Sequence, residues 1–228
     1  MPDSVRALTF LLVGLGLMMA ACKESDAESP LLFENAIANY TRSVRTAIVQ
    51  MHISEGIPYE NMRFNRPEEF DTLDSADIGV FHPAGGGRLG KRISYQPAPS
   101  DFLAENADGQ WLINAELAIP LLPGKAGSEG PGEVTDRLGE IVVYLPGFKK
   151  EYCGRVNEEW GIAGIPKLQS DQSAYYSKRM IDDGVADYVL PTGPQPYLDH
   201  PAFEGQIYGC FESFSGGSYV FFNVLIER

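Results

Sequence analysis

A single apolar stripe near the start of the chain limits what this sequence can fold into. Apolar side chains recur every three or four residues at Phe33, Ile37, Tyr40, Val44, Ile48 and Met51. That spacing is typical of one face of an α-helix. Ser29-Pro30 offers a capping side chain and a first-turn proline, and Gly56 can end the helix. We therefore predict a helix over residues 30–54 that buries Ile37, Tyr40, Val44 and Ile48 against another layer.

The middle of the chain favours short strands. Apolar and β-branched residues bounded by Gly, Pro or Asp predict strands at 78–81, 92–96 and 110–117. Residues 140–145 fit either a strand or the end of a helix. A short helix is expected after Pro146-Gly147, with Cys153, Val156 and Trp160 on one face.

The end of the chain predicts an antiparallel hairpin. Residues 206–211 and 219–226 flank a Ser-Gly-Gly turn at 215–217, and the last strand is apolar enough to be central in its sheet. With no internal repeat, the sequence predicts one α+β domain over 30–228. Its long N-terminal amphipathic helix packs on an antiparallel sheet, and loops cover 58–75, 124–132 and 161–201.

An export signal is expected ahead of this domain. An apolar run from Ala7 ends at Cys22, and the chain then becomes polar. Met19-Ala20-Ala21-Cys22 resembles the end of a bacterial lipoprotein signal, which implies a lipid on Cys22; a plain cleaved signal or a retained anchor are the alternatives. We predict a signal or anchor segment at 1–22, a polar tether at 23–29, and a location in the bacterial cell envelope, exported and membrane-anchored. By the same resemblance, Lys23 favours the outer membrane.

Net charge and cysteine content bear on the binding partners and on the disulfides that we expect. The net charge of −13 predicts a surface that repels nucleic acid. If Cys22 carries the lipid, Cys153 and Cys210 remain, and an even remainder in an exported chain predicts one disulfide between them. Two buried free thiols are the alternative.

A phosphate-binding loop is suggested by Gly85-Gly-Gly-Arg-Leu-Gly-Lys91 but fails on inspection. Arg92 stands where a magnesium-binding Ser or Thr is required, and the residues that follow favour a strand where a helix should begin. The segment is therefore read as a glycine turn.

Metal and catalytic sites are not predicted either. The three histidines, His52, His82 and His200, lack metal-ligand spacing. Asp182, Asp183 and Asp199 beside His200 could supply oxygen ligands, but nothing in the sequence fixes a geometry. Ser213 and Ser215 lack a nucleophile-elbow pattern. Three basic residues near Cys153 could lower the pKa of its thiol, namely Lys149, Lys150 and Arg155, but a disulfide to Cys210 would leave no thiol to activate. We expect no enzyme activity and no cofactor.

The overall organisation resembles type IV pilins and type II secretion pseudopilins. An apolar N-terminal segment, a long amphipathic helix, a strand-rich body and a late disulfide carry the resemblance, together with the patterns at 81–87, 145–157, 208–210 and 219–225. The Gly-Phe-Thr-Leu-Ile-Glu head of prepilins is missing, so a pilin-like body on a lipid anchor is expected.

The resemblance implies a non-enzymatic envelope protein whose partners are other envelope, secretion or filament proteins and the membrane, but not nucleic acid. The alternative is a periplasm-facing lipoprotein that binds or modifies a small ligand or glycan. A helix packed on a sheet without a cleft favours the first function, and a lined pocket favours the second.

Overall fold

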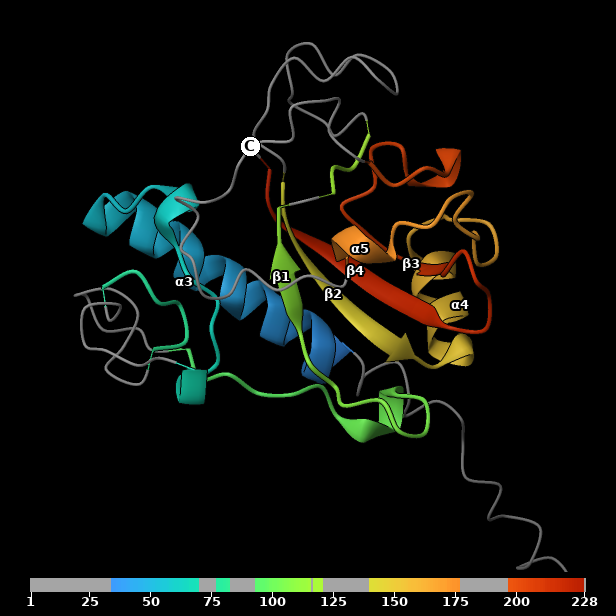
Figure 1. Ribbon diagram of the computed structural model, residues 1–228, viewed down its shortest axis with the longest axis horizontal. Helices are drawn as coiled ribbons and strands as arrows, with labels where there is room; N and C mark the ends of the chain where they lie inside the picture. The colour runs from blue at the N-terminus through green and yellow to red at the C-terminus, as the bar shows by residue number, and fades with distance from the viewer. Residues whose placement is uncertain are drawn as a thin grey trace, which may run out of the picture. The chain divides into compact units, whose positions relative to one another are not determined.

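A computed structural model of the chain describes residues 34–69, 77–82, 93–115, 117–120, 140–176 and 197–227 (Figure 1). The chain divides into two units, residues 1–34 and 35–228, and the sheet and the helices α3 to α5 belong to the second. The predicted signal segment 1–22, the tether 23–29 and the loop 124–132 lie outside the described residues.

The predicted N-terminal helix is present as α3, Asn39–Glu55, and follows a π-helical turn at Glu34–Ala38. It ends where predicted, at Gly56, which adopts a left-handed conformation with φ of 68°. The predicted start at Ser29-Pro30 lies outside the described residues. Ile37, Val44, Ile48 and Met51 are buried, as the stripe requires. Tyr40 is the exception, because it is only half-buried and lies beside the core.

Four antiparallel strands form a single sheet in the order β1-β2-β4-β3. The strands are β1 Leu112–Asn114, β2 Ile141–Phe148, β3 Tyr208–Glu212 and β4 Tyr219–Ile226. The hairpin of β3 and β4 matches the prediction, and β4 is central, with β2 on one side and β3 on the other. The coarse prediction of an α+β fold with a helix and an antiparallel sheet is therefore confirmed.

Strand β2 settles the ambiguity at residues 140–145 but runs further than predicted. Pro146 and Gly147 lie inside the strand, at an irregularity in its pairing with β4. Proline has no N–H to give to a ladder and is tolerated at such points. Gly147 has a φ of 75°, and a Cβ there would lie 2.5 Å from the Cβ of Ala107. The short helix α4, Lys150–Glu159, then begins three residues later than Gly147.

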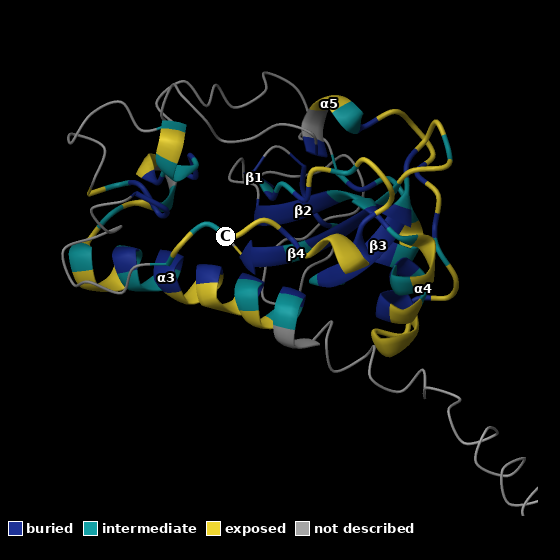
Figure 2. Ribbon diagram, turned by 90° about the horizontal axis from the view of Figure 1, so that it is seen from below, coloured by how far each residue is buried: buried dark blue, intermediate teal, exposed yellow. Residues whose placement is uncertain are grey.

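Helices α3 and α4 lie on the same face of the sheet. The Asn223 side chain on β4 donates to the hydroxyl of Thr41 on α3 at 2.9 Å, so the odd-numbered residues of β4 face α3. Cys210 pairs with Phe221 in the register and is bonded to Cys153 of α4, which places α4 on that face too. Figure 2 shows α3 and α4 below the strands and α5 above them.

The opposite face of the sheet is covered by irregular chain. A cluster of buried side chains joins the even-numbered face of β4 to residues from the predicted loop 161–201 and just beyond it: Ile162, Leu168, Tyr176, Leu198, Phe203, Val220, Phe222 and Val224. The helical pieces here are short, α5 at Ser173–Tyr176 and a 3₁₀ turn at Pro201–Phe203. The described parts of this loop therefore form a structural layer, which the sequence did not predict.

Two predicted strands are absent from the sheet. Residues 78–81 form turns with one isolated bridge, between Gly79 and Arg63. Residues 93–99 run without a regular ladder, and the predicted strand 110–117 contracts to β1. Three further 3₁₀ turns, at Tyr59–Asn61, Pro67–Glu69 and Ser100–Phe102, complete the described connections.

Docking of α3 can be tested with a matched pair of substitutions on that helix. Val44 is 2% exposed and Ile53 is 75% exposed, and both are β-branched aliphatic residues. Val44→Asp should lower the free energy of unfolding by about 3–5 kcal/mol, because it buries a charge without a partner. Ile53→Asp should change it by less than about 1 kcal/mol. Urea denaturation followed by circular dichroism measures both free energies of unfolding. Equally small changes for the two variants would show that α3 is not docked.

Candidate functional site

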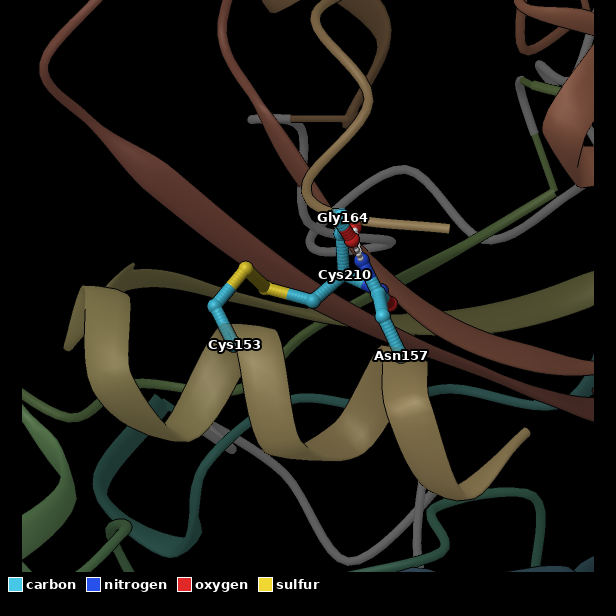
Figure 3. The surroundings of a disulfide bond; sticks show 4 residues. All are labelled: Cys153, Asn157, Gly164 and Cys210. Atoms are coloured by element: carbon cyan, nitrogen blue, oxygen red, sulfur yellow. Dashed lines mark hydrogen bonds between the residues drawn. A yellow bond between two sulfur atoms is a disulfide. The ribbon is translucent and has the colours of Figure 1, made fainter. Parts of the chain in front are cut away.

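The predicted disulfide joins α4 to β3. Cys153 and Cys210 are bonded with a Cα–Cα distance of 5.3 Å, which is ordinary for a disulfide, and both residues are fully buried (Figure 3). The prediction of this pair is confirmed. The nearby basic residues Lys149, Lys150 and Arg155 therefore do not activate a free thiol at Cys153.

Asn157, one turn further along α4, holds the same strand by its side chain. Its Nδ2 donates to the carbonyl oxygens of Cys210 and Gly164, and its Oδ1 accepts from the Cys210 N–H, each at 2.8 Å (Figure 3). Asn157 is fully buried. A single amide thus takes the place that a neighbouring strand would take at Cys210.

Near the end of β3, main-chain hydrogen bonds also occupy the outer edge of the strand. The Glu212 N–H donates to the Pro166 carbonyl at 2.8 Å, and the Leu168 N–H donates to the Glu212 carbonyl at 3.0 Å. Exposed strand edges invite pairing with other chains. Cys210 and Glu212 therefore have outward-facing main-chain groups that are already engaged.

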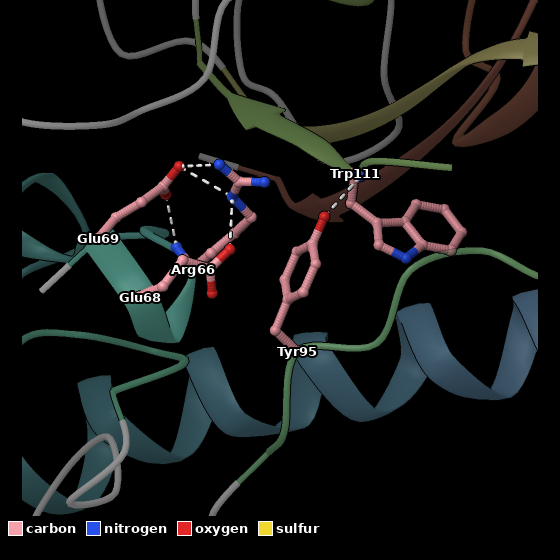
Figure 4. A network of polar contacts seen from close by, with 5 residues as sticks. All are labelled: Arg66, Glu68, Glu69, Tyr95 and Trp111. Atoms are coloured by element: carbon pink, nitrogen blue, oxygen red, sulfur yellow. Dashed lines mark hydrogen bonds and ion pairs between the residues drawn. The ribbon is translucent and has the colours of Figure 1, made fainter. Parts of the chain in front are cut away.

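A second feature is the segment 93–99, which is hydrogen-bonded to α3 through Tyr40 and to Trp111 just before β1. The Tyr40 hydroxyl accepts from the Gln96 N–H at 3.1 Å, and Trp111 Nε1 donates to the Gln96 carbonyl at 2.8 Å. The Tyr95 hydroxyl accepts from the Trp111 N–H at 3.2 Å, close to the Arg66–Glu69 ion pair (Figure 4). Burial raises the pKa of the Tyr40 hydroxyl, so it keeps its proton at physiological pH.

A pocket of about 780 Å³ lies between α3 and this segment. On the helix side it is lined by Asn39, Ser43, Thr46 and Gln50, and on the other side by Ser94, Gln96, Pro97 and Pro99. Ala47 and Trp111, both buried, lie at its base beside Tyr40. The structure thus combines a helix docked on a sheet with a lined pocket, so it has a feature of each of the two functions weighed from the sequence.

The histidines have local structural contacts. His52 Nδ1 lies 3.0 Å from the Ile57 carbonyl, and its ring stacks on Tyr59. His200 Nδ1 accepts from the Ala202 N–H and caps a 3₁₀ turn. His82 is buried. Within the described ranges, no group of three or more His, Cys, Asp or Glu side chains could hold a metal ion.

The other residues considered as site candidates either make local hydrogen bonds or lie outside the described residues. Asp199 accepts from the Gln169 N–H and from the Ser170 hydroxyl, which ties two stretches of loop together. Ser213 and Ser215 hydrogen-bond each other in the hairpin turn, at 3.3 Å. Asp182, Asp183 and the glycine segment 85–91 lie outside the described residues.

Sequence reasoning missed the residues that organise both features. The sequence predicts Tyr40 only as part of the apolar helix stripe and Trp111 only as part of the strand 110–117, and it gives Asn157 no role of its own. The sequence around Asn157 offers one hint that it is buried: it lies one turn after Cys153, on the buried face of α4. Trp160, predicted to share that face, is instead 41% exposed at the end of the helix.

Comparison with protein-family models, with curated proteins and with solved structures found no match for this chain. Among the helices that the structure describes, none has the length and apolar character to cross a membrane. The predicted anchor segment 1–22 lies outside the described residues.

The disulfide should resist reduction while the protein is folded. Both sulfurs are buried, so dithiothreitol alone should leave the bond intact, and dithiothreitol with urea should release two thiols that iodoacetamide then alkylates. Replacing both cysteines by alanine should lower the free energy of unfolding by about 4 kcal/mol through the lost restraint on the unfolded chain. Rapid alkylation of Cys153 and Cys210 in the untreated native protein would contradict this pairing.

Asn157 should matter as much as a core residue. Asn157→Leu keeps the volume but leaves buried main-chain groups of Cys210 without partners, and should lower the free energy of unfolding by about 3 kcal/mol or more. Asn157→Asp should regain part of the loss as the pH falls, because only the protonated carboxyl can donate to the Cys210 carbonyl. Glu158→Ala, on the exposed side of α4, is the control and should have little effect.

Proposed function

We propose that this protein is a non-enzymatic, pilin-like subunit of the bacterial cell envelope that works through contacts with other subunits. The observation that carries the proposal is the docking of α3 across one face of the sheet, with the Thr41–Asn223 hydrogen bond and the buried stripe at its centre. The chain that precedes α3 would carry the anchor, which we place on a lipid at Cys22.

The use of the polar side chains supports a contact role. Asn157 replaces a strand neighbour, Asp199 ties two loops, and Asn223 holds α3 on the sheet. Each of these residue types is common in catalytic sites, yet here each one links segments that are distant in the sequence. These polar side chains thus hold the segments of one body together.

The contact face that we propose is the solvent side of α3. Arg42 and Arg45 are exposed there, with Ile53 on the same side of the helix. Asn39–Glu55 holds two arginines and one glutamate, although the whole chain has a net charge of −13. A basic helix face on an acidic protein complements the acidic surface of a second copy of the same chain, and we propose a second copy as the partner.

Photo-crosslinking in intact envelopes tests this function. A photoreactive residue in place of Ile53 should give a product with the mass of two copies, because the side chain is exposed beside the basic face. Arg42→Glu with Arg45→Glu should reduce that product by about tenfold through like-charge repulsion. Arg155→Glu, an exposed charge reversal on α4, should leave it unchanged.

Two further results would decide the case. Cys22→Ser should release the protein from the membrane and remove the product, since the copies are then no longer held on one surface. A product that persists at full yield after both arginines are reversed would overturn the proposed contact face. A product only with a different envelope protein would replace the second copy as partner.

A further inference from the structure

The pocket between α3 and residues 93–99 differs in character from the rest of the protein. The described residues that line it are all uncharged, in a chain in which 21% of the residues are charged. Its sides carry amide and hydroxyl groups, and its base is aromatic and apolar. We propose that this pocket binds an uncharged saccharide. The inference does not rest on the contact role proposed above.

The uncharged lining selects against ionic ligands. Moving a charged group out of water into a pocket without an opposite charge is unfavourable. Arg42 donates to Asn39 Oδ1 at 2.8 Å and is exposed, and it is not among the described residues that line the pocket. The pocket therefore suits a ligand that is polar but neutral.

The amide groups fit the hydroxyls of a sugar. Within the described part of the chain, the side-chain amides of Gln50 and Gln96 have no hydrogen-bond partner, and they line the pocket from opposite sides. An amide can donate and accept at once, as a sugar hydroxyl also does. The hydroxyls of Ser43 and Thr46 donate to helix carbonyls and keep lone pairs to accept from a ligand.

The base of the pocket fits the other half of a sugar. A pyranose ring has an apolar C–H face as well as its rim of hydroxyls. Tyr40 and Trp111 pack with ring centroids 5.4 Å apart at the base, next to Ala47. Ligand pockets commonly combine such apolar surface with a few placed polar groups, and 780 Å³ lies within their usual range of about 300–1,000 Å³.

A peptide fits the pocket less well along residues 96–99, because the main chain there has no free donor. The Gln96 N–H is bonded to Tyr40, the Ala98 N–H is bonded to the Gly109 carbonyl, and Pro97 and Pro99 have no N–H. The main chain of α3 is bonded within the helix. A peptide strand therefore cannot be added along residues 96–99, which is the usual way that extended peptides bind.

Tryptophan fluorescence tests the proposal directly. The chain has two tryptophans, and Trp160 lies away from the pocket beside Tyr208. In a full-length Trp160→Phe protein, held in a detergent without a sugar headgroup, Trp111 reports alone. Tri-N-acetylchitotriose and maltotriose are the neutral probes, and trigalacturonate is a charged probe of the same length. We expect a saturable change with at least one neutral probe and binding at least about tenfold weaker for the charged one.

Substitutions then assign the signal to the pocket. Gln50→Ala and Gln96→Ala should each weaken binding by about three- to tenfold, the usual range for one lost hydrogen bond. Gln169→Ala, an exposed glutamine outside the pocket, is the matched control and should bind normally. Thermal unfolding confirms that each variant is folded. No saturable change with either neutral probe, equal affinity for trigalacturonate, no effect of the pocket variants, or displacement by a proline-rich peptide would each overturn the proposal.

Discussion

The rest of the fold depends on β4 being apolar on both of its faces. Phe221 and Leu225 point toward α3 and α4, and Val220, Phe222 and Val224 point the other way, and all of them are buried. A central strand of this kind needs a cover on each side, because an uncovered face would leave large aromatic surface in water. Helices α3 and α4 supply one cover, and the described irregular chain at 162–176 and 197–203 supplies the other. The disulfide and Asn157 fix α4 in the first cover by attaching it to the neighbouring strand β3.

Periodic patterns predicted the elements whose position is set by burial. The stripe of α3, the hairpin of β3 and β4 and the central place of β4 all follow from where apolar residues recur. The failures share a different cause. Residues 78–81 and 93–96 have strand-like composition, but among the described residues no strand lies beside them with which to pair. Strand β2 was expected to end by residue 145, yet an irregularity in the ladder accommodates Pro146 and Gly147 within it. Strand pairing is a tertiary event, so local composition does not determine it.

The candidate site was less predictable, because it depends on contacts between distant segments. The Cys153–Cys210 pair could be predicted because these two cysteines remain once Cys22 is assigned to the expected lipid. Nothing in the neighbourhood of Asn157 shows that its amide will meet β3, which lies 53 residues further along the sequence. In the same way, Tyr40 meets Gln96 only because the sheet brings residues 93–99 alongside α3. The apolar stripe predicted Tyr40 as core, and the structure makes it the link that holds one side of the pocket.

Helix α3 has three sides with different surroundings: one faces the sheet, one lines the pocket and one faces solvent. Around its axis, the buried stripe through Val44 and Ile48 faces the sheet, the uncharged sector through Ser43 and Gln50 faces the pocket, and the sector through Arg42, Arg45 and Ile53 faces solvent. The sectors are adjacent: Tyr40 and Ala47 border both the sheet and the pocket, and Arg42 donates to Asn39 at the edge of the pocket. A ligand in the pocket and a subunit on the basic sector would therefore lie side by side on the same helix. Both would depend on the first sector, since a helix released from the sheet would lose the pocket wall and the contact face together.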